Sequence, residues 1–119
     1  MEAKEKLTIF LESWKNRDFQ EMFDSSQLSW ASENYPNTLA VKFGHWQIED
    51  FEVMEETPYE EEIVSDVSFR IKSKGIWTDP STARVVREIG PFKASKDGKW
   101  GVNPISAMRI LSKIKKGMY

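Results

Sequence analysis

The chain contains no cysteine, and this absence excludes a disulfide framework, a thiolate zinc site and a cysteine nucleophile. Long apolar runs are also missing. No stretch approaches the roughly 18 residues that a membrane-spanning helix needs, and the charged start Met1–Lys6 leads into no signal-peptide core. We therefore expect a soluble cytoplasmic protein without membrane contact. An exported domain trimmed of its signal is the alternative.

An excess of positive charge is lacking as well. The chain has 17 lysine and arginine residues against 19 acidic ones, which gives a net charge of −2. Binding to nucleic acid needs clustered basic side chains facing phosphates, so we expect no nucleic-acid partner. The length of 119 residues suits one domain, residues 1–119. Aromatic residues make up 13%, so Trp and Phe are expected to build much of its core.

Apolar residues near the start of the chain repeat with helical spacing. They share one stripe at i, i+3, i+4 and i+7: Leu7, Phe10, Leu11 and Trp14. Asp18, followed three residues later by Glu21, has the pattern of a capping box that opens a second short helix. We expect Asn37 to cap a third helix over residues 38–43, and Gly44 to end it in the left-handed conformation.

The pattern then changes to the two-residue period of strands. A first strand is predicted from Trp46 to Val53, with a β-bulge near Glu49-Asp50 where the apolar phase flips. A second runs from about Tyr59 to Ile71, with alternating apolar and polar faces. A third covers residues 83–95, with a bulge or kink at Gly90-Pro91.

The end of the chain carries two local signals. Asp97-Gly98 predicts a tight turn into a last strand that contains Trp100 and Val102. Asn103-Pro104 has the pattern of a cap followed by proline in the first helical position, and predicts a terminal helix through Leu111. Helices at one end and strands at the other predict an α+β domain, with helices packed on a strongly bent, mainly antiparallel sheet.

Two segments carry a resemblance to a known family. The run Trp14-Lys15-Asn16-Arg17-Asp18-Phe19-Gln20-Glu21-Met22-Phe23 resembles the break between the first two helices of the NTF2-like (cystatin-like, SnoaL-like) superfamily. The run Asp97-Gly98-Lys99-Trp100-Gly101-Val102-Asn103 resembles the final hairpin of such domains. The resemblance implies a cone-shaped α+β domain, often a homodimer through its sheet, with a pocket between sheet and helices. It implies no single activity, because the superfamily includes isomerases, dehydratases, hydrolases and domains without chemistry.

Candidate catalytic groups are few. His45 is the single histidine, and an imidazole titrating near pH ~6.5 can act as a general base. Asp50 lies at the expected bulge, where the direction of its side chain is open. Neither has a recognisable orienting partner, and no metal-ligand spacing, phosphate-binding loop or cofactor motif is present. A solvated histidine and a surface aspartate are the alternative interpretations.

These observations favour a non-catalytic module that binds a ligand or associates with proteins, acting as a homodimer through the sheet face. We expect a small apolar or carboxylate ligand in a pocket lined by aromatic side chains and one arginine: Phe10, Trp14, Trp46, Phe69, Arg87 and Trp100. For Arg87 the alternatives are a ligand carboxylate, an internal ion pair with a glutamate, or a place at the rim of a dimer interface. The alternative function is a small-molecule isomerase, dehydratase or hydrolase that uses His45 or Asp50 as its base.

Overall fold

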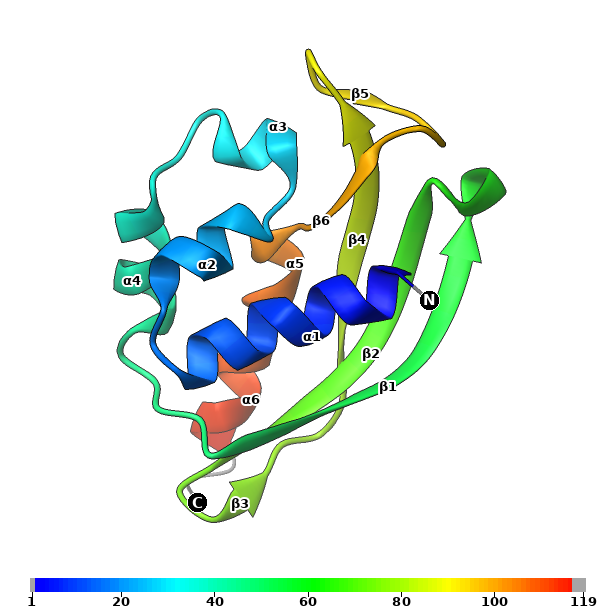
Figure 1. Cartoon of the computed structure of the whole chain (residues 1–119). Helices are drawn as coiled ribbons and strands as arrows, with labels where there is room; N and C mark the ends of the chain where they lie inside the picture. The colour runs from blue at the N-terminus through cyan, green and yellow to red at the C-terminus, as the bar shows by residue number, and fades with distance from the viewer. Residues whose placement is uncertain (1, 117–119) are drawn as a thin grey trace.

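The computed structural model describes residues 2–116, and the side chains of residues 2–114. Four helices come first, a six-stranded antiparallel sheet follows, and two short helices end the described part (Figure 1). The helices are α1 (Glu2–Lys15), α2 (Phe19–Asp24), α3 (Leu28–Ala31), α4 (Pro36–Phe43), α5 (Pro104–Ala107) and α6 (Ile110–Lys116). The strands are β1 (Asp50–Tyr59), β2 (Val64–Ser73), β3 (Ile76–Trp77), β4 (Ser81–Ile89), β5 (Lys93–Ala94) and β6 (Lys99–Val102). The predicted α+β class and antiparallel sheet are confirmed.

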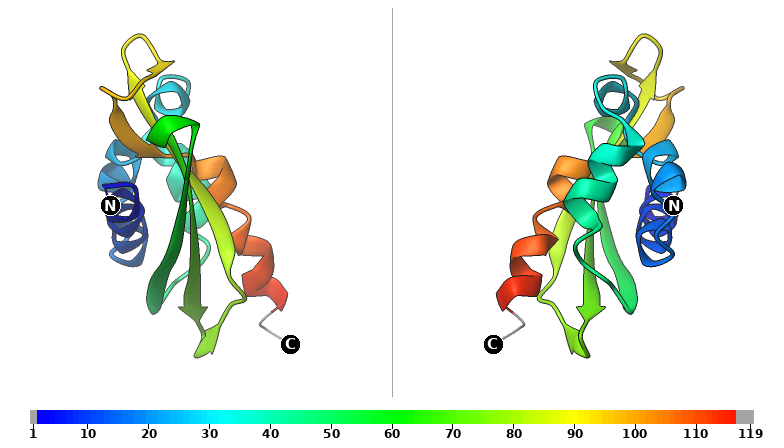
Figure 2. Two further views of the ribbon diagram at one scale, coloured as in Figure 1. Left: turned by 90° about the vertical axis from the view of Figure 1, so that its right-hand side faces the viewer. Right: turned by 90° about the vertical axis from the view of Figure 1, so that its left-hand side faces the viewer.

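Helix α1 organises the core, as its apolar stripe predicts. It crosses one face of the sheet and contacts β1, β2, β4 and β6, and Figure 2 shows α1 and α6 on either side of the strands. The ring of Trp14 meets that of Phe43 edge to face, with centroids 4.9 Å apart. Its indole N–H donates to the main-chain carbonyls of Phe43 (3.1 Å) and Trp46 (3.0 Å). This single side chain therefore ties α1 to the end of α4 and to the segment that enters the sheet.

Strand β2 is the centre of the sheet and has the expected two faces. Every second residue is buried against the helices: Ser65, Val67, Phe69, Ile71 and Ser73. The opposite face carries Asp66, Ser68, Arg70 and Lys72, which are only half-buried. We call this polar surface of β1, β2 and β4 the outer face. On it, Arg70 pairs with Glu52 (2.7 Å) and lies 4.5 Å over the ring of Trp77.

Three strand predictions are wrong in their boundaries. The bulge lies between Val53 and Glu56, not at Glu49-Asp50, because Trp46 and Ile48 precede the sheet and do not belong to β1. Tyr59 ends β1, and Glu60–Glu62 form a turn with positive φ angles before β2 begins at Val64. Holding a non-glycine residue at positive φ costs about 1 kcal/mol or more, so a run of glutamates does not lead one to expect such a turn. The sequence therefore gives no signal for it. The predicted third strand, residues 83–95, corresponds to two strands in the structure, β4 and β5, which are separated by the turn at Gly90-Pro91.

Of the helix-cap predictions, two are confirmed and two are wrong. Asp18 caps α2 by accepting from the amide of Glu21 (3.1 Å), and Asn103 caps α5, as predicted. Asn37 is not a cap: α4 begins at Pro36, two residues before the predicted start, with Tyr35 as the N-cap. Gly44 has φ −67 and is not left-handed; its lack of a side chain matters because a Cβ there would lie 2.1 Å from the carbonyl oxygen of Ala40. The predicted terminal helix is split into α5 and α6.

The segment after α2 closes the free edge of β6. Ser26 forms a parallel bridge with Val102, and the amide of Gln27 donates to the carbonyl of Val102 (2.8 Å). Gly101 makes this approach possible, since a Cβ there would lie 2.6 Å from the Cα of Gln27. The buried carboxylate of Glu88 on β4 holds the same segment from the side. It accepts from the Gln27 side-chain amide (2.8 Å), the Ser29 amide (2.9 Å) and the Ser29 hydroxyl (2.9 Å).

Candidate anion-binding site

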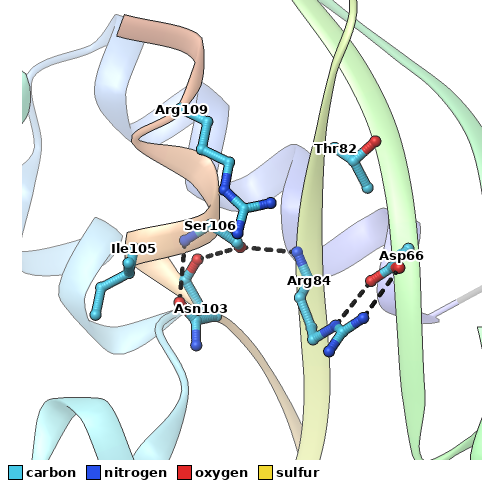
Figure 3. A pocket seen from close by; sticks show the side chains of 7 residues that line it. All are labelled: Asp66, Thr82, Arg84, Asn103, Ile105, Ser106 and Arg109. Carbon is cyan, nitrogen blue, oxygen red and sulfur yellow. Dashed lines mark hydrogen bonds and ion pairs between the residues drawn. The ribbon is translucent and has the colours of Figure 1, made fainter.

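A polar hollow of about 300 Å³ lies between β4 and the start of the C-terminal helices (Figure 3). Strand β2 supplies Asp66 and β4 supplies Thr82 and Arg84. The cap and first turns of the C-terminal helical region supply the other lining residues: Asn103, Ile105, Ser106 and Arg109. We call this hollow the Arg109 site. It brings together side chains as far apart in the sequence as Asp66 and Arg109, which no local spacing predicts.

One of its two arginines is already neutralised. Asp66 and Arg84 are register partners on β2 and β4, and both point away from the core. The guanidinium of Arg84 donates to both oxygens of Asp66, at 2.9 and 3.2 Å. These hydrogen bonds, together with the negative charge of Asp66, raise the pKa of the Arg84 guanidinium. The pair therefore contributes a fixed dipole to the hollow but little net charge.

The cap of α5 forms the rigid back of the hollow. The Asn103 side-chain oxygen accepts from the amide of Ser106 (3.1 Å), and its amide group donates to the side chain of Gln27 (3.1 Å). The Ser106 hydroxyl donates to the carbonyl of Asn103 (2.7 Å) and accepts from the main-chain amide of Arg84 (2.8 Å). The Ser106 proton is thus committed to the fold and is not offered to a ligand.

Two lining groups are left with unused hydrogen-bond donors. Among the residues whose side chains the structure describes, neither the guanidinium of Arg109 nor the hydroxyl of Thr82 has a hydrogen-bond or ion-pair partner. Both residues are exposed at the mouth of the hollow, and Figure 3 shows the Arg109 guanidinium turned toward β4. The parallel N–H groups of a free guanidinium suit an anion with two acceptor oxygens.

The predicted aromatic pocket is distributed over the molecule. Phe10, Trp14 and Phe69 lie in the packed core, each no more than 1% exposed. Trp46 is half-buried at their border. Close packing of this kind leaves the interior occupied by side chains at the position where a ligand was expected.

Arg87 and Trp100, in contrast, lie in contact with each other, near the N-terminal end of α1. The Arg87 guanidinium lies 5.1 Å over the Trp100 ring and donates to the carbonyl of Gly98 (3.4 Å). Within residues 2–114 it forms no ion pair, so the internal glutamate partner considered from sequence is not observed there. A hollow of about 170 Å³ lies beside it, and three glutamates share its lining: Glu2, Glu56 and Glu62. Their negative charges disfavour a carboxylate ligand at this place.

The two candidate bases lie on the surface. His45 is exposed in the segment after α4, and Asp50 is exposed at the start of β1. The Asp50 carboxylate accepts from the amide of Phe51 (2.8 Å), a local contact that any strand-entry aspartate can make. Neither residue lines the Arg109 site or the hollow beside Arg87.

Comparisons of this chain with protein-family models, with curated proteins and with solved structures found no match. Within the described residues, no helix has both the length and the apolar character required to cross a bilayer.

Proposed function

We propose that this chain is a non-catalytic ligand-binding module and that it binds an anion in the Arg109 site. The observation that carries the proposal is the guanidinium of Arg109, which has no partner among the described side chains and lines the hollow together with a balanced Arg84–Asp66 pair. An arginine with every donor unused gains charge-assisted hydrogen bonds from an incoming anion, and it breaks no internal contact to do so.

Binding is favoured over catalysis by what surrounds the candidate bases. A general base needs a positioned partner and a site that excludes water. His45 and Asp50 are exposed, and the core near α1 is filled by Phe10, Trp14 and Phe69. A small-molecule enzyme that uses His45 or Asp50 is the alternative function, and these two positions give it no enclosed reaction chamber.

The NTF2-like cone is part of this proposal. Three features support it: the order of helices before strands, the packing of α1 across the sheet, and the curvature of β1, β2 and β4 in Figure 1. A bulge in β1 adds to this curvature, because bulges increase local twist and bend the strand.

The binding proposal is tested by titrating the 15N-labelled full chain with acetate, sulfate and phosphate at constant ionic strength. We expect amide shifts to concentrate at Thr82, Arg84 and Ser106. Arg109→Gln should weaken binding about tenfold, the equivalent of roughly 1.4 kcal/mol for one lost guanidinium pair. Lys42→Gln, which removes the same charge from an exposed position on α4, is the matched control and should change affinity less than about twofold. Absence of shifts at these amides with all three anions would refute the proposal.

We also propose a homodimer through the outer face. That face carries charges of alternating sign, among them the ion pair Glu52–Arg70 on the neighbouring strands β1 and β2. Two copies related by a two-fold axis can exchange such partners across an interface. Light scattering after size exclusion should give twice the chain mass of 13.9 kDa, and Arg70→Glu should shift it to the single mass. A single-chain mass for the unaltered protein at high concentration rejects the dimer and leaves the ligand proposal unaffected.

A further inference from the structure

We infer that the ligand of the Arg109 site is a monocarboxylate with an apolar substituent, in preference to a phosphate. This inference rests on the proposed function, since it names the chemical class that the same site selects. Three features of the hollow carry it: its net charge, its free donors and its single apolar lining residue.

The charge of the hollow matches one negative charge. Arg84 is balanced by Asp66 through two hydrogen bonds, so Arg109 supplies the one uncompensated positive charge among the lining residues. A carboxylate carries one negative charge and is balanced by it. A phosphate monoester carries about −1.5 to −2 at neutral pH, so part of its charge would stay unpaired and would face the Asp66 carboxylate.

The free donors match two acceptor oxygens. A guanidinium presents parallel N–H groups that meet both oxygens of a carboxylate, and Arg109 lines the hollow with such a group. The remaining polar groups are used within the fold: the Ser106 hydroxyl proton bonds to Asn103, and the Arg84 side chain bonds to Asp66. The third and fourth oxygens of a phosphate would thus find few donors at this site.

The rest of the ligand has both room and an apolar contact. The hollow measures about 300 Å³, several times the space of a carboxylate group alone. Ile105 is its one large apolar lining residue, and this side chain is 62% exposed on the first turn of α5. An alkyl or aryl substituent that covers Ile105 removes apolar surface from water on both molecules, which an inorganic anion cannot do.

The experiment compares acetate, butanoate, hexanoate and inorganic phosphate on the full chain, at one pH near neutrality and one ionic strength, by calorimetry and amide shifts. We expect affinity to rise along the carboxylate series, with hexanoate about tenfold tighter than acetate and at least tenfold tighter than phosphate. Ile105→Ser should reduce the hexanoate preference over acetate to less than about threefold. Because Ile105 is mostly exposed, this variant should keep the fold of the parent.

The outcomes separate the two claims. Phosphate binding more tightly than hexanoate, with the Arg109 dependence intact, overturns the ligand class and leaves the site in place. Equal affinity for acetate and hexanoate, unchanged by Ile105→Ser, overturns the apolar part of the inference in the same way. Failure of every titrant to bind at Thr82, Arg84 and Ser106 overturns the proposed function and the inference with it.

Discussion

Replacing Glu88 with alanine should destabilise the protein more than any other single carboxylate removal among the described residues. Glu88 is 6% exposed and lies where β4 meets the segment between α2 and α3. It accepts three hydrogen bonds from Gln27 and Ser29, at 2.8, 2.9 and 2.9 Å. The four-residue helix α3 is too short to be stable by itself, so its position depends on contacts of this kind.

The magnitude follows from what each substitution leaves unpaired. A hydrogen bond to a charged group contributes about 1.5–3 kcal/mol, but the buried carboxylate also loses hydration, which offsets part of the sum. For Glu88→Ala we expect a loss of about 3 kcal/mol in the free energy of unfolding. Glu88→Gln keeps the shape and can still accept from the amide of Ser29, while its own amide group faces the Gln27 donor. That variant should lose about 1–2 kcal/mol.

The assay is urea unfolding followed by circular dichroism, with hydrogen exchange at the amide of Ser29 as a local measure. Glu33→Ala, at an exposed glutamate just after α3, is the matched control and should stay within about 0.5 kcal/mol of the parent. The reasoning fails if Glu88→Ala unfolds at the parent midpoint, or if the Ser29 amide keeps its protection. If hydrogen bonds are what is lost, the free energy of unfolding should be lowest for Glu88→Ala, intermediate for Glu88→Gln and highest for the parent. Lost packing alone would leave Glu88→Gln near the parent.

Three further variants test other contacts. Trp14→Phe removes the indole donor from two buried carbonyls and should cost about 2–3 kcal/mol by urea unfolding. Gly101→Ala places a Cβ 2.6 Å from the chain and should cost about 1–3 kcal/mol, whereas Gly90→Ala, with nothing within 4 Å, should cost less. Although burial raises the pKa of the Glu56 carboxyl, the Ser65 hydroxyl (2.7 Å) brings it below its usual 4.5. The unfolded chain therefore takes up the proton first as pH falls. This stabilisation is present above about pH 4.5 and is lost below it, so Ser65→Ala should lose less stability on acidification than the parent.

The parts of the fold that sequence predicts are those fixed within a few residues. The stripe through Leu7 and Trp14, and the caps at Asp18 and Asn103, need only their immediate neighbours, and all are found in the structure. The end of β1 at Tyr59 and the turn at Glu60–Glu62 carry no local signal, because the three residues with positive φ angles there are glutamates and not turn-forming residues. Trp46 was assigned to a strand because its apolar character suits one, whereas its carbonyl serves as an acceptor for Trp14.

The candidate site was less accessible from sequence. The cap at Asn103 was predicted, but its role as the back of a hollow depends on the approach of β4, which places the Arg84 amide 2.8 Å from Ser106. The alternation from Tyr59 to Ile71 places Asp66 on the polar face of its strand, whereas its pairing with Arg84 depends on the register of β2 and β4. Arg109 carries no local motif at all. Its interest as a ligand-binding group comes from the lack of a partner among the described side chains, a property that a linear pattern does not contain.

The first strand of the sheet has a consequence for behaviour at high concentration. Strand β1 pairs only with β2 in the described chain, so its other edge presents unsatisfied main-chain donors and acceptors to any neighbouring copy. The irregularity after Val53, the ring of Pro58 and the carboxylates of Glu52 and Glu55 all obstruct in-register addition of another strand. Acidification removes the charge repulsion while leaving the hydrogen-bonding template intact, so fibril growth in this protein should start at that edge and at low pH.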